Sequence, residues 1–176
     1  MWVQSPESPS ATRGRHFIGA FLFSSFSSIV LRKLTLFLRN AYLLGMYCIL
    51  DHSIIPNFLI QGGDFTHGDG RGGETIYNGE LFEDESFEVP LNRPYVLVNS
   101  NKGQPNSNGS QFFITTAKTQ WLQGKYVAFG KVLKGEEAVQ AVEKFGSSTG
   151  EPSRDVRIID CGEVDLLPED KEVSYW

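Results

Sequence analysis

The sequence predicts a mainly β protein, built as a small antiparallel β-barrel with one clear helix. Short runs of aromatic and β-branched residues recur along the chain, long Gly-rich loops separate them, and only one segment, near 135–145, has a helical period. Many short strands joined by tight turns favour a barrel over a helical bundle or a parallel α/β fold. The 176 residues suffice for one compact domain and are too few for two comfortable ones.

The chain changes character near Asp51. Residues 1–50 carry five basic residues and one acidic residue, a net charge of +4, whereas residues 51–176 carry eleven and twenty, a net charge of −9. The overall charge of −5 argues against a nucleic-acid partner held by electrostatics. We therefore expect a basic, hydrophobic N-terminal segment over 1–50, a folded domain over 51–165, and an acidic tail over 166–176.

The N-terminal segment leaves two interpretations open. "RGRHFIGAFLFSSFSSIVL" places two arginines before a mostly apolar run, as in a secretory signal or a mitochondrial presequence. The uncharged run from Phe17 to Leu31 is shorter than the roughly 20 residues that span a bilayer. Residues 17–50 therefore suit either targeting and membrane association or amphipathic helices packed on the domain. No alternating pattern predicts strands within residues 1–50.

The elements of the domain follow in order from Asn57. "GEEAVQAVEKFG" has apolar residues at helical spacing and a closing glycine, so it predicts the single helix. Apolar, aromatic and β-branched runs bounded by turn residues predict strands. These runs are "NFLIQ" (57–61), "RPYVLVNSN" (93–101), "QFFITT" (111–116), "YVAFGKV" (126–132) and "DVRIIDCGEV" (155–164).

The Gly-rich stretch 62–73 is predicted to be a loop. It contains a G-x-G-x-x-G match at Gly68, Gly70 and Gly73. A dinucleotide site requires that motif to open a helix, and here β-branched residues and another glycine follow, so the match is coincidental. The three histidines show no metal-ligand spacing. We expect no metal and no cofactor.

Five motifs give the domain a family resemblance. "IIPNFLIQGGDF", "GGETIY", "NSNGSQFFITTAKTQWLQGK", "VAFGKVLKG" and "DCGEV", from Ile54 to Val164, resemble the cyclophilins, the cyclosporin-binding peptidyl-prolyl cis–trans isomerases. The resemblance implies a cyclophilin-like barrel and an enzyme of protein folding that acts on X–Pro bonds. Its partners would be proline-containing peptides or proteins, and cyclosporin. "THGDGRGG" and "FITT" are nearer the secretory-pathway members, so that compartment is favoured over mitochondrion or cytoplasm.

The resemblance also implies a pocket for the proline ring, lined by Phe58, Leu59, Phe113 and Leu122. On composition alone, a plain hydrophobic core is the favoured interpretation of Phe58, Leu59 and Phe113. An X–Pro bond isomerises slowly because its amide must lose resonance, at a barrier of roughly 18–20 kcal/mol. Catalysis needs an apolar grip on the ring and a donor for the twisted amide, without metal or cofactor.

Five further residues match family positions around that pocket. Gln61 corresponds to the family's catalytic glutamine, and Gln111 is a second amide beside the groove. Asn101 matches the asparagine whose backbone holds the substrate, although Gln104 is inserted just after it. Trp121 matches the tryptophan associated with cyclosporin contact. Tyr126 stands where the family has a histidine, so we expect peptides to bind differently there.

The largest departure within the motifs is Ser53, which occupies the position of the family's catalytic arginine. A hydroxyl lacks the reach, charge and forked donors of a guanidinium. Losing one such donor typically costs about 10²–10³ in rate, so we expect reduced isomerase activity. A non-catalytic module that binds proline peptides, or a truncated isoform, remains the alternative. The family's first two strands and first helix are not recognisable in the sequence, which predicts an incomplete barrel.

Overall fold

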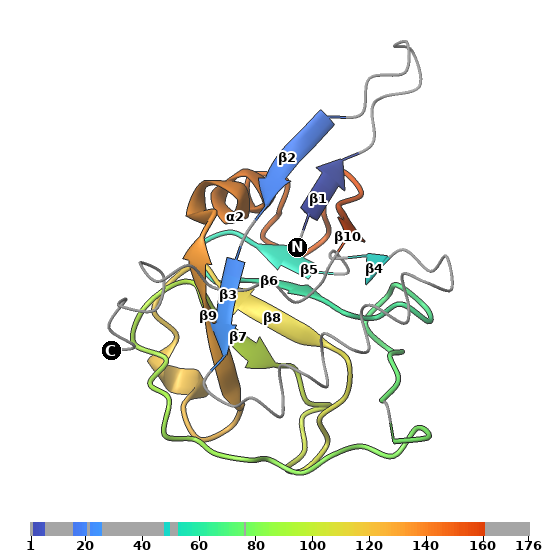
Figure 1. The fold of residues 1–176 in the computed structure, drawn as a ribbon, viewed down its shortest axis with the longest axis vertical. Helices are drawn as coiled ribbons and strands as arrows, with labels where there is room; N and C mark the ends of the chain where they lie inside the picture. Colours follow the sequence, from blue (N-terminus) through green and yellow to red (C-terminus); the bar gives the residue numbers. More distant parts are fainter. Residues whose placement is uncertain are drawn as a thin grey trace.

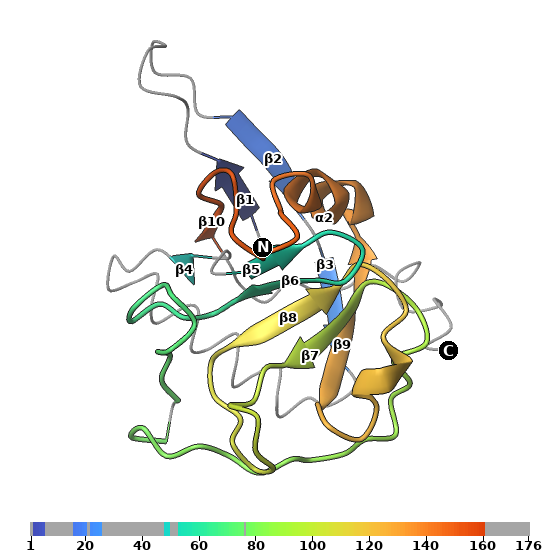
Figure 2. The ribbon, with the colours of Figure 1, turned by 180° about the vertical axis from the view of Figure 1, so that it is seen from behind.

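The computed structural model describes residues 53–75 and 77–160, together with the backbone of four short strands within residues 2–49. The described strands form two antiparallel sheets (Figure 1). The larger sheet has six strands in the order β3-β9-β7-β8-β6-β5, and the smaller has four in the order β2-β1-β10-β4. Figure 2 shows β6, β8 and β7 side by side from the opposite direction.

Most elements after Asp51 are as predicted. The helix predicted near 135–145 is α2, Glu136–Glu143, and every predicted strand segment overlaps an observed strand, whereas the strand Ser53–Ile55 was not predicted. The larger sheet is built from β3 (Leu22–Ser25), β5 (Ser53–Ile55), β6 (Leu59–Gly62), β7 (Val96–Asn99), β8 (Phe112–Thr115) and β9 (Ala128–Lys134). The smaller sheet is built from β1 (Trp2–Ser5), β2 (His16–Ala20), β4 (Cys48–Ile49) and β10 (Arg157–Asp160), and a 3₁₀ turn, η1, covers Gln120–Leu122.

The N-terminal segment differs from its prediction. We expected a barrel without its first strands, but β1 pairs with β10, and β3 covers the edge of β9. These segments have no alternating sequence pattern, and each is extended because a neighbouring strand offers unpaired backbone groups. The missing-strand prediction is therefore wrong for these segments. The packed-helix interpretation is likewise wrong at β2 and β3, which are strands. The rest of residues 1–52, to which the targeting and packed-helix interpretations also apply, and the acidic tail 166–176 lie outside the described residues.

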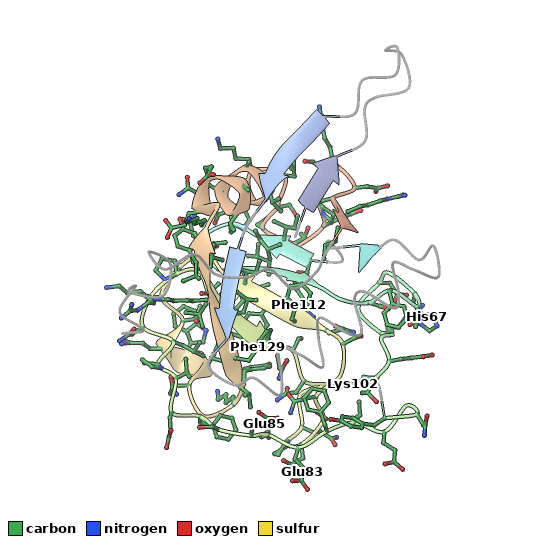
Figure 3. The ribbon with its side chains drawn as sticks, viewed as in Figure 1. His67, Glu83, Glu85, Lys102, Phe112 and Phe129 are labelled. Atoms are coloured by element: carbon green, nitrogen blue, oxygen red, sulfur yellow. The ribbon has the colours of Figure 1, made fainter. Side chains whose placement is uncertain are left out.

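The larger sheet is buried on both faces because its side chains alternate between two apolar clusters. Phe112 and Ile114 of β8 point to one cluster, and Phe113 points to the other. Figure 3 labels Phe112 and Phe129 among the side chains of the first cluster. We call this cluster the helix-side core: Ile54, Ile60, Leu97, Phe112, Ile114, Phe129, Val132, Ala138, Val139, Val142, Val156 and Ile158. The second is the site-side cluster: Leu59, Leu91, Val96, Val98, Phe113 and Ala128.

Helix α2 closes the helix-side core. Its residues Ala138, Val139 and Val142 are buried, as the spacing in the sequence predicts for one apolar face. Glu136 and Glu137 lie in its first turn, where negative charge stabilises a helix. In the part of the chain that the structure describes, no helix is long and apolar enough to cross a membrane. Because α2 packs on one face of the sheet, the opposite face is left for a binding site.

Candidate active site

Neighbouring strands of the larger sheet place polar and apolar residues in a single cross-strand row. Ser53 of β5 is paired with Gln61 of β6. Gln61 is in turn paired with Phe113 of β8, which is paired with Val98 of β7. Side chains of directly paired residues share one face of a sheet. Since Phe113 and Val98 belong to the site-side cluster, Ser53 and Gln61 are presented on that same face.

The four residues predicted to form the proline pocket come together on this face. Leu59 and Phe113 are buried in the site-side cluster, and Phe58, Leu122 and Tyr126 pack against it while partly exposed. The rings of Phe113 and Tyr126 meet edge to face, with centroids 5.5 Å apart. This geometry is the favourable one for aromatic pairs, so it fixes the orientation of both rings. An apolar surface with an aromatic wall suits a proline ring.

Trp121 lies at the outer border of that surface. Its ring stacks on Phe58 with centroids 5.9 Å apart, yet its side chain is 60% exposed. It belongs to the 3₁₀ turn η1, in which none of the residues is buried. A large apolar side chain held at the surface by a neighbouring ring is available to a ligand. The structure therefore places Trp121 beside the predicted proline pocket rather than in a core.

The two glutamines of the site are joined to each other. Nε2 of Gln61 donates to Oε1 of Gln111 at 2.9 Å and also lies 3.0 Å from Oγ of Ser100. Nε2 of Gln111 donates to the carbonyls of Gly70, at 2.7 Å, and of Gly72, at 3.0 Å. Partly buried amides are costly without partners, and here each has them. Sequence reasoning missed Ser100, because nothing in a lone serine after a strand predicts a contact with Gln61.

A buried carboxylate organises the Gly-rich loop that reaches Gln111. Asp64 is fully buried and accepts hydrogen bonds from the backbone N–H groups of His67, Asp69, Gly70 and Gly72. Burial raises the pKa of Asp64, but these backbone donors together outweigh it and hold the pKa well below its ordinary value. The loop is therefore fixed from inside, which positions the Gly70 and Gly72 carbonyls. Sequence reasoning missed Asp64, although an Asp that opens a Gly-rich loop is a typical turn residue.

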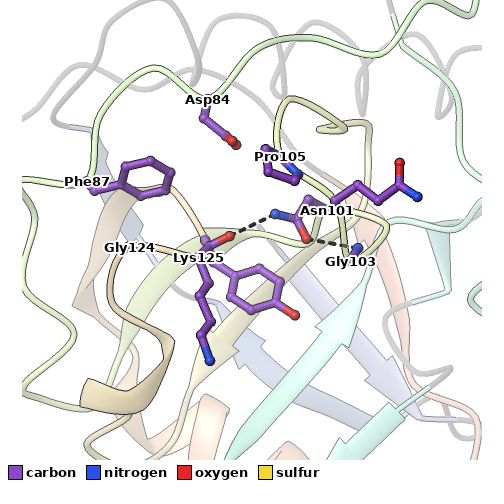
Figure 4. Close-up of a pocket in the computed structure, with 9 residues that line it drawn as sticks. Asp84, Phe87, Asn101, Gly103, Pro105, Gly124 and Lys125 are labelled. Carbon is purple, nitrogen blue, oxygen red and sulfur yellow. Dashed lines mark hydrogen bonds between the residues drawn. The ribbon is translucent and has the colours of Figure 1, made fainter.

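The side chain of Asn101 forms hydrogen bonds to the loops around the site. Its Nδ2 donates to the carbonyl of Lys125 at 2.8 Å, and its Oδ1 accepts from the N–H of Gly103 at 3.1 Å (Figure 4). Among residues 53–75 and 77–160, no hydrogen bond to the backbone of Asn101 is present. The side chain thus orients a backbone segment whose own N–H and C=O face no protein partner there.

Ser53 is partly buried and lies against Gly150. A Cβ added to Gly150 would come within 2.7 Å of the hydroxyl oxygen of Ser53. The neighbouring backbone is held to this segment, because the N–H of Ile54 donates to the carbonyl of Gly150 at 2.8 Å. The position thus has a defined environment, in line with Gln61. Within the described residues, no three His, Cys, Asp or Glu side chains gather as metal ligands.

Comparison with known proteins identifies this arrangement. The model of the cyclophilin-type peptidyl-prolyl cis–trans isomerase family matches residues 43–163. The chain belongs to the cyclophilin family. A crystal structure of a Cryptosporidium parvum cyclophilin-type peptidyl-prolyl cis–trans isomerase, in the presence of the dipeptide Ala-Pro, matches this cyclophilin at 31% identity and a TM-score of 0.74. That match covers 94% of this cyclophilin and 100% of the other chain.

The family and the mainly antiparallel fold predicted from the motifs are thus confirmed. The chain is a cyclophilin-type isomerase by family and by fold. The roles of its individual residues, Ser53 first among them, are matters of proposal.

Proposed function

We propose that this cyclophilin isomerises X–Pro bonds in proteins at a rate limited by the serine at position 53. The observation that carries the proposal is the pairing of Ser53 with Gln61 in a row that ends on Phe113. An intact apolar surface and an intact amide network support binding of the proline. The strong cationic donor expected beside them is absent from the row.

The chemistry assigns distinct tasks to the residues. Phe113, Leu122 and Phe58 hold the proline ring, and the backbone of Asn101 holds the preceding residue. The chain is then free to rotate about one bond while the ring stays fixed. As the amide twists, its nitrogen becomes a stronger hydrogen-bond acceptor, and a donor aimed at that nitrogen lowers the barrier. Ser53 can donate one neutral hydrogen bond, whereas an arginine donates several charged ones.

The amide pair supplies a second, weaker contribution. Gln61 is held by Gln111 and Ser100, so its position costs little entropy when a substrate binds. A preorganised polar group beside a pocket orients the substrate carbonyl through fixed geometry. We therefore infer residual catalysis from binding, orientation and Gln61, rather than a complete loss.

We infer that cyclosporin binds the same surface. Trp121 is exposed beside Phe58, and the surrounding site-side cluster is apolar, as a large lipophilic ligand requires. The substrate class would be proline-containing peptides or unfolded segments of proteins. The Ala-Pro dipeptide named for the Cryptosporidium parvum structure is of this class.

The direct test replaces Ser53 with arginine. Isomerisation of an Ala-Pro tetrapeptide is followed for the wild type, Ser53→Arg and Ser53→Lys. We expect the arginine variant to gain about 10²–10³ in kcat/KM and the lysine variant to gain much less, because only a guanidinium has the forked donors. Equal activity of wild type and Ser53→Arg would overturn the proposal.

A non-catalytic binding module is the second candidate, and Ser53 is the observation that favours it. Peptide affinity distinguishes the two. A wild type that binds the tetrapeptide with no isomerisation above the uncatalysed rate, and gains activity with Ser53→Arg, is a binding module. A wild type with measurable activity that the arginine raises further is a weakened isomerase.

A further inference from the structure

A pocket of about 310 Å³ adjoins the candidate active site (Figure 4). It shares Asn101 and Tyr126 with that site, and neither glutamine of the amide network lines it. Its remaining lining comes from two loops and one further segment: Asp84, Phe87, Gly103, Gln104, Pro105, Gly124 and Lys125. Because Tyr126 also packs edge to face on Phe113, a peptide bound at Phe113 passes close to this pocket.

Asp84 gives the pocket its charge. Figure 4 shows its carboxylate directed between Phe87 and Pro105. Each carboxylate oxygen already accepts one hydrogen bond, Oδ2 from the N–H of Asn106 and Oδ1 from Nδ2 of Asn108, both at 2.8 Å. These bonds fix the carboxylate, and an ionised carboxylate offers about four acceptor directions, so capacity for a ligand remains.

The charge of Asp84 is not neutralised by the base in the lining. Lys125 contributes to the pocket, but Figure 4 shows its side chain directed away from Asp84 and Pro105. The backbone carbonyl of Lys125, in contrast, accepts a hydrogen bond from Nδ2 of Asn101 in the pocket wall. The segment 80–88 around Asp84 contains five acidic residues and no basic one. A cation therefore gains electrostatically on entering, and an anion is repelled.

Phe87 supplies an aromatic wall of the pocket. It is 38% exposed, so its ring is accessible to a ligand in the pocket. The loop that carries it is fixed, because Nε2 of Gln123 donates to the carbonyls of both Phe87 and Val89. A ring face beside a carboxylate is a favourable site for an ammonium or guanidinium group.

We propose that this pocket is a second substrate subsite, which binds the side chain of a lysine or arginine near the proline. The proposal rests on the proposed function, since it requires a proline peptide to occupy the neighbouring site. Asp84 pairs with the cationic head, and Phe87 and Pro105 contact the aliphatic stem. Long basic side chains carry such a stem, so an apolar wall and a carboxylate together select them over short or acidic residues.

The test compares matched peptides on the full-length protein. An Ala-rich peptide with one central proline is made with lysine, norleucine or glutamate at each of three positions on either side. Norleucine is an apolar side chain of similar length, so the pair isolates the charge. Affinities are measured by calorimetry at low and high salt for the wild type, Asp84→Asn and Glu83→Gln. The last is the control, because it removes the same charge from an exposed neighbour outside the pocket.

The subsite requires a lysine preference of at least about threefold over norleucine at one position, as expected for a partly exposed ion pair together with a cation–π contact. It also requires the preference to be lost in Asp84→Asn and kept in Glu83→Gln. Equal binding of lysine and norleucine at all six positions, with the neutral peptides still bound, overturns the subsite and leaves the proposed function standing. Equal losses in the two variants overturn it too, because the charge effect would then be diffuse.

Failure of every peptide to bind would overturn the proposed function and the subsite with it. Asp84→Asn also alters the bonds to Asn106 and Asn108, so thermal unfolding is measured beside binding. If that variant is unfolded, the lysine preference of Phe87→Leu is measured instead, because this substitution removes only the aromatic ring. A lysine preference reduced about two- to fivefold in Phe87→Leu supports the subsite, and an unchanged preference counts against it.

Discussion

The side-chain amide of Gln61, in β6, donates at 2.9 Å to Oε1 of Gln111, the residue that precedes β8. This bond connects the predicted catalytic row to the Gly-rich loop, because Gln111 holds the carbonyls of Gly70 and Gly72 with its own Nε2. The active-site amide is therefore positioned from outside the sheet. Its orientation thus depends on the Gly-rich loop through Gln111.

Replacing Gln111 with alanine is expected to weaken both the fold and the site. The carbonyls of Gly70 and Gly72 would lose their donor, and Gln61 would retain only Ser100. Leaving buried polar groups unpaired costs about 1–3 kcal/mol of the free energy of unfolding. We also expect roughly tenfold weaker binding of a proline tetrapeptide, measured by calorimetry, because Gln61 would need to be ordered by the substrate.

A double-mutant cycle with Gln61→Ala separates a shared network from two independent effects. Coupling of about 0.5–3 kcal/mol in the free energy of binding is expected if the two amides act together. Strict additivity would count against it. Gln140→Ala is a suitable control, because Nε2 of Gln140 makes an exposed bond to the hydroxyl of Tyr95 and its helix, α2, packs on the helix-side core.

Asp64 predicts a specific acid sensitivity. Its pKa in the folded protein is held below the ordinary value, whereas the unfolded chain has the usual value of about 3.9. The unfolded state therefore binds the proton more readily at low pH. The stability due to Asp64 is fully present above about pH 5 and is lost as the pH falls through and below 3.9.

We accordingly expect Asp64→Asn to unfold more easily than the wild type by at least about 2 kcal/mol at pH 7, because an amide cannot accept from all the loop donors. The gap should narrow as the pH falls from 5 to 3, in urea titrations at each pH. Asp155→Asn is the control, since Asp155 is exposed and its ion pair with Arg157 is worth little. A gap that widens in acid contradicts the assignment.

The residues of the site-side face could be predicted from the sequence because they lie in contiguous motifs whose strands show in their own residue pattern. The side chains of the Leu59–Gly62 and Phe112–Thr115 strands alternate between the two clusters, and the second strand consists entirely of aromatic and β-branched residues. The pairing of Ser53 with Gln61 was not predicted, because strand β5 was not recognised in the sequence. What the sequence could identify was the set of residues that the fold brings into one row.

The remainder depends on contacts between distant segments. Strand β3 forms by pairing with β9, which lies more than a hundred residues later in the chain. Its own sequence resembles an apolar helix or a targeting signal. Asp64 and Ser100 are ordinary residues until the loop folds back on Gln111. The Asp84 pocket likewise joins segments near 84, 103 and 125 that share no pattern. The local secondary-structure propensity of a segment carries no information about its contacts with distant segments.

Trp121 is expected to report on occupancy of the site. It stacks on Phe58 and is largely exposed, so a ligand that covers it changes its fluorescence. Adding cyclosporin or a proline tetrapeptide to the wild type should shift the emission to shorter wavelength, as burial of an indole does. Trp121→Phe should remove that shift while leaving peptide binding measurable by calorimetry. A shift that persists in Trp121→Phe would place the ligand elsewhere.

We predict that position 150, beside Ser53, tolerates no residue other than glycine without a loss of stability. It has φ of +89°, and an added Cβ would lie 2.7 Å from Oγ of Ser53. Gly124 offers a matched comparison, since it has φ of +77° but nothing within 4 Å of an added Cβ. Both alanine variants carry the cost of a left-handed backbone, about 1–2 kcal/mol, and only Gly150→Ala adds crowding, of about 1–3 kcal/mol.

Urea unfolding of the two variants therefore measures the crowding at Ser53 by difference. We expect Gly150→Ala to be the less stable, and the double variant Gly150→Ala with Ser53→Ala to recover part of the loss, because the crowded hydroxyl is gone. Equal stabilities of Gly150→Ala and Gly124→Ala would mean that Ser53 has room to turn away. In that case the side chain at position 53 is not held in its row, and a Ser53→Arg variant would have freedom to point elsewhere than toward the proline.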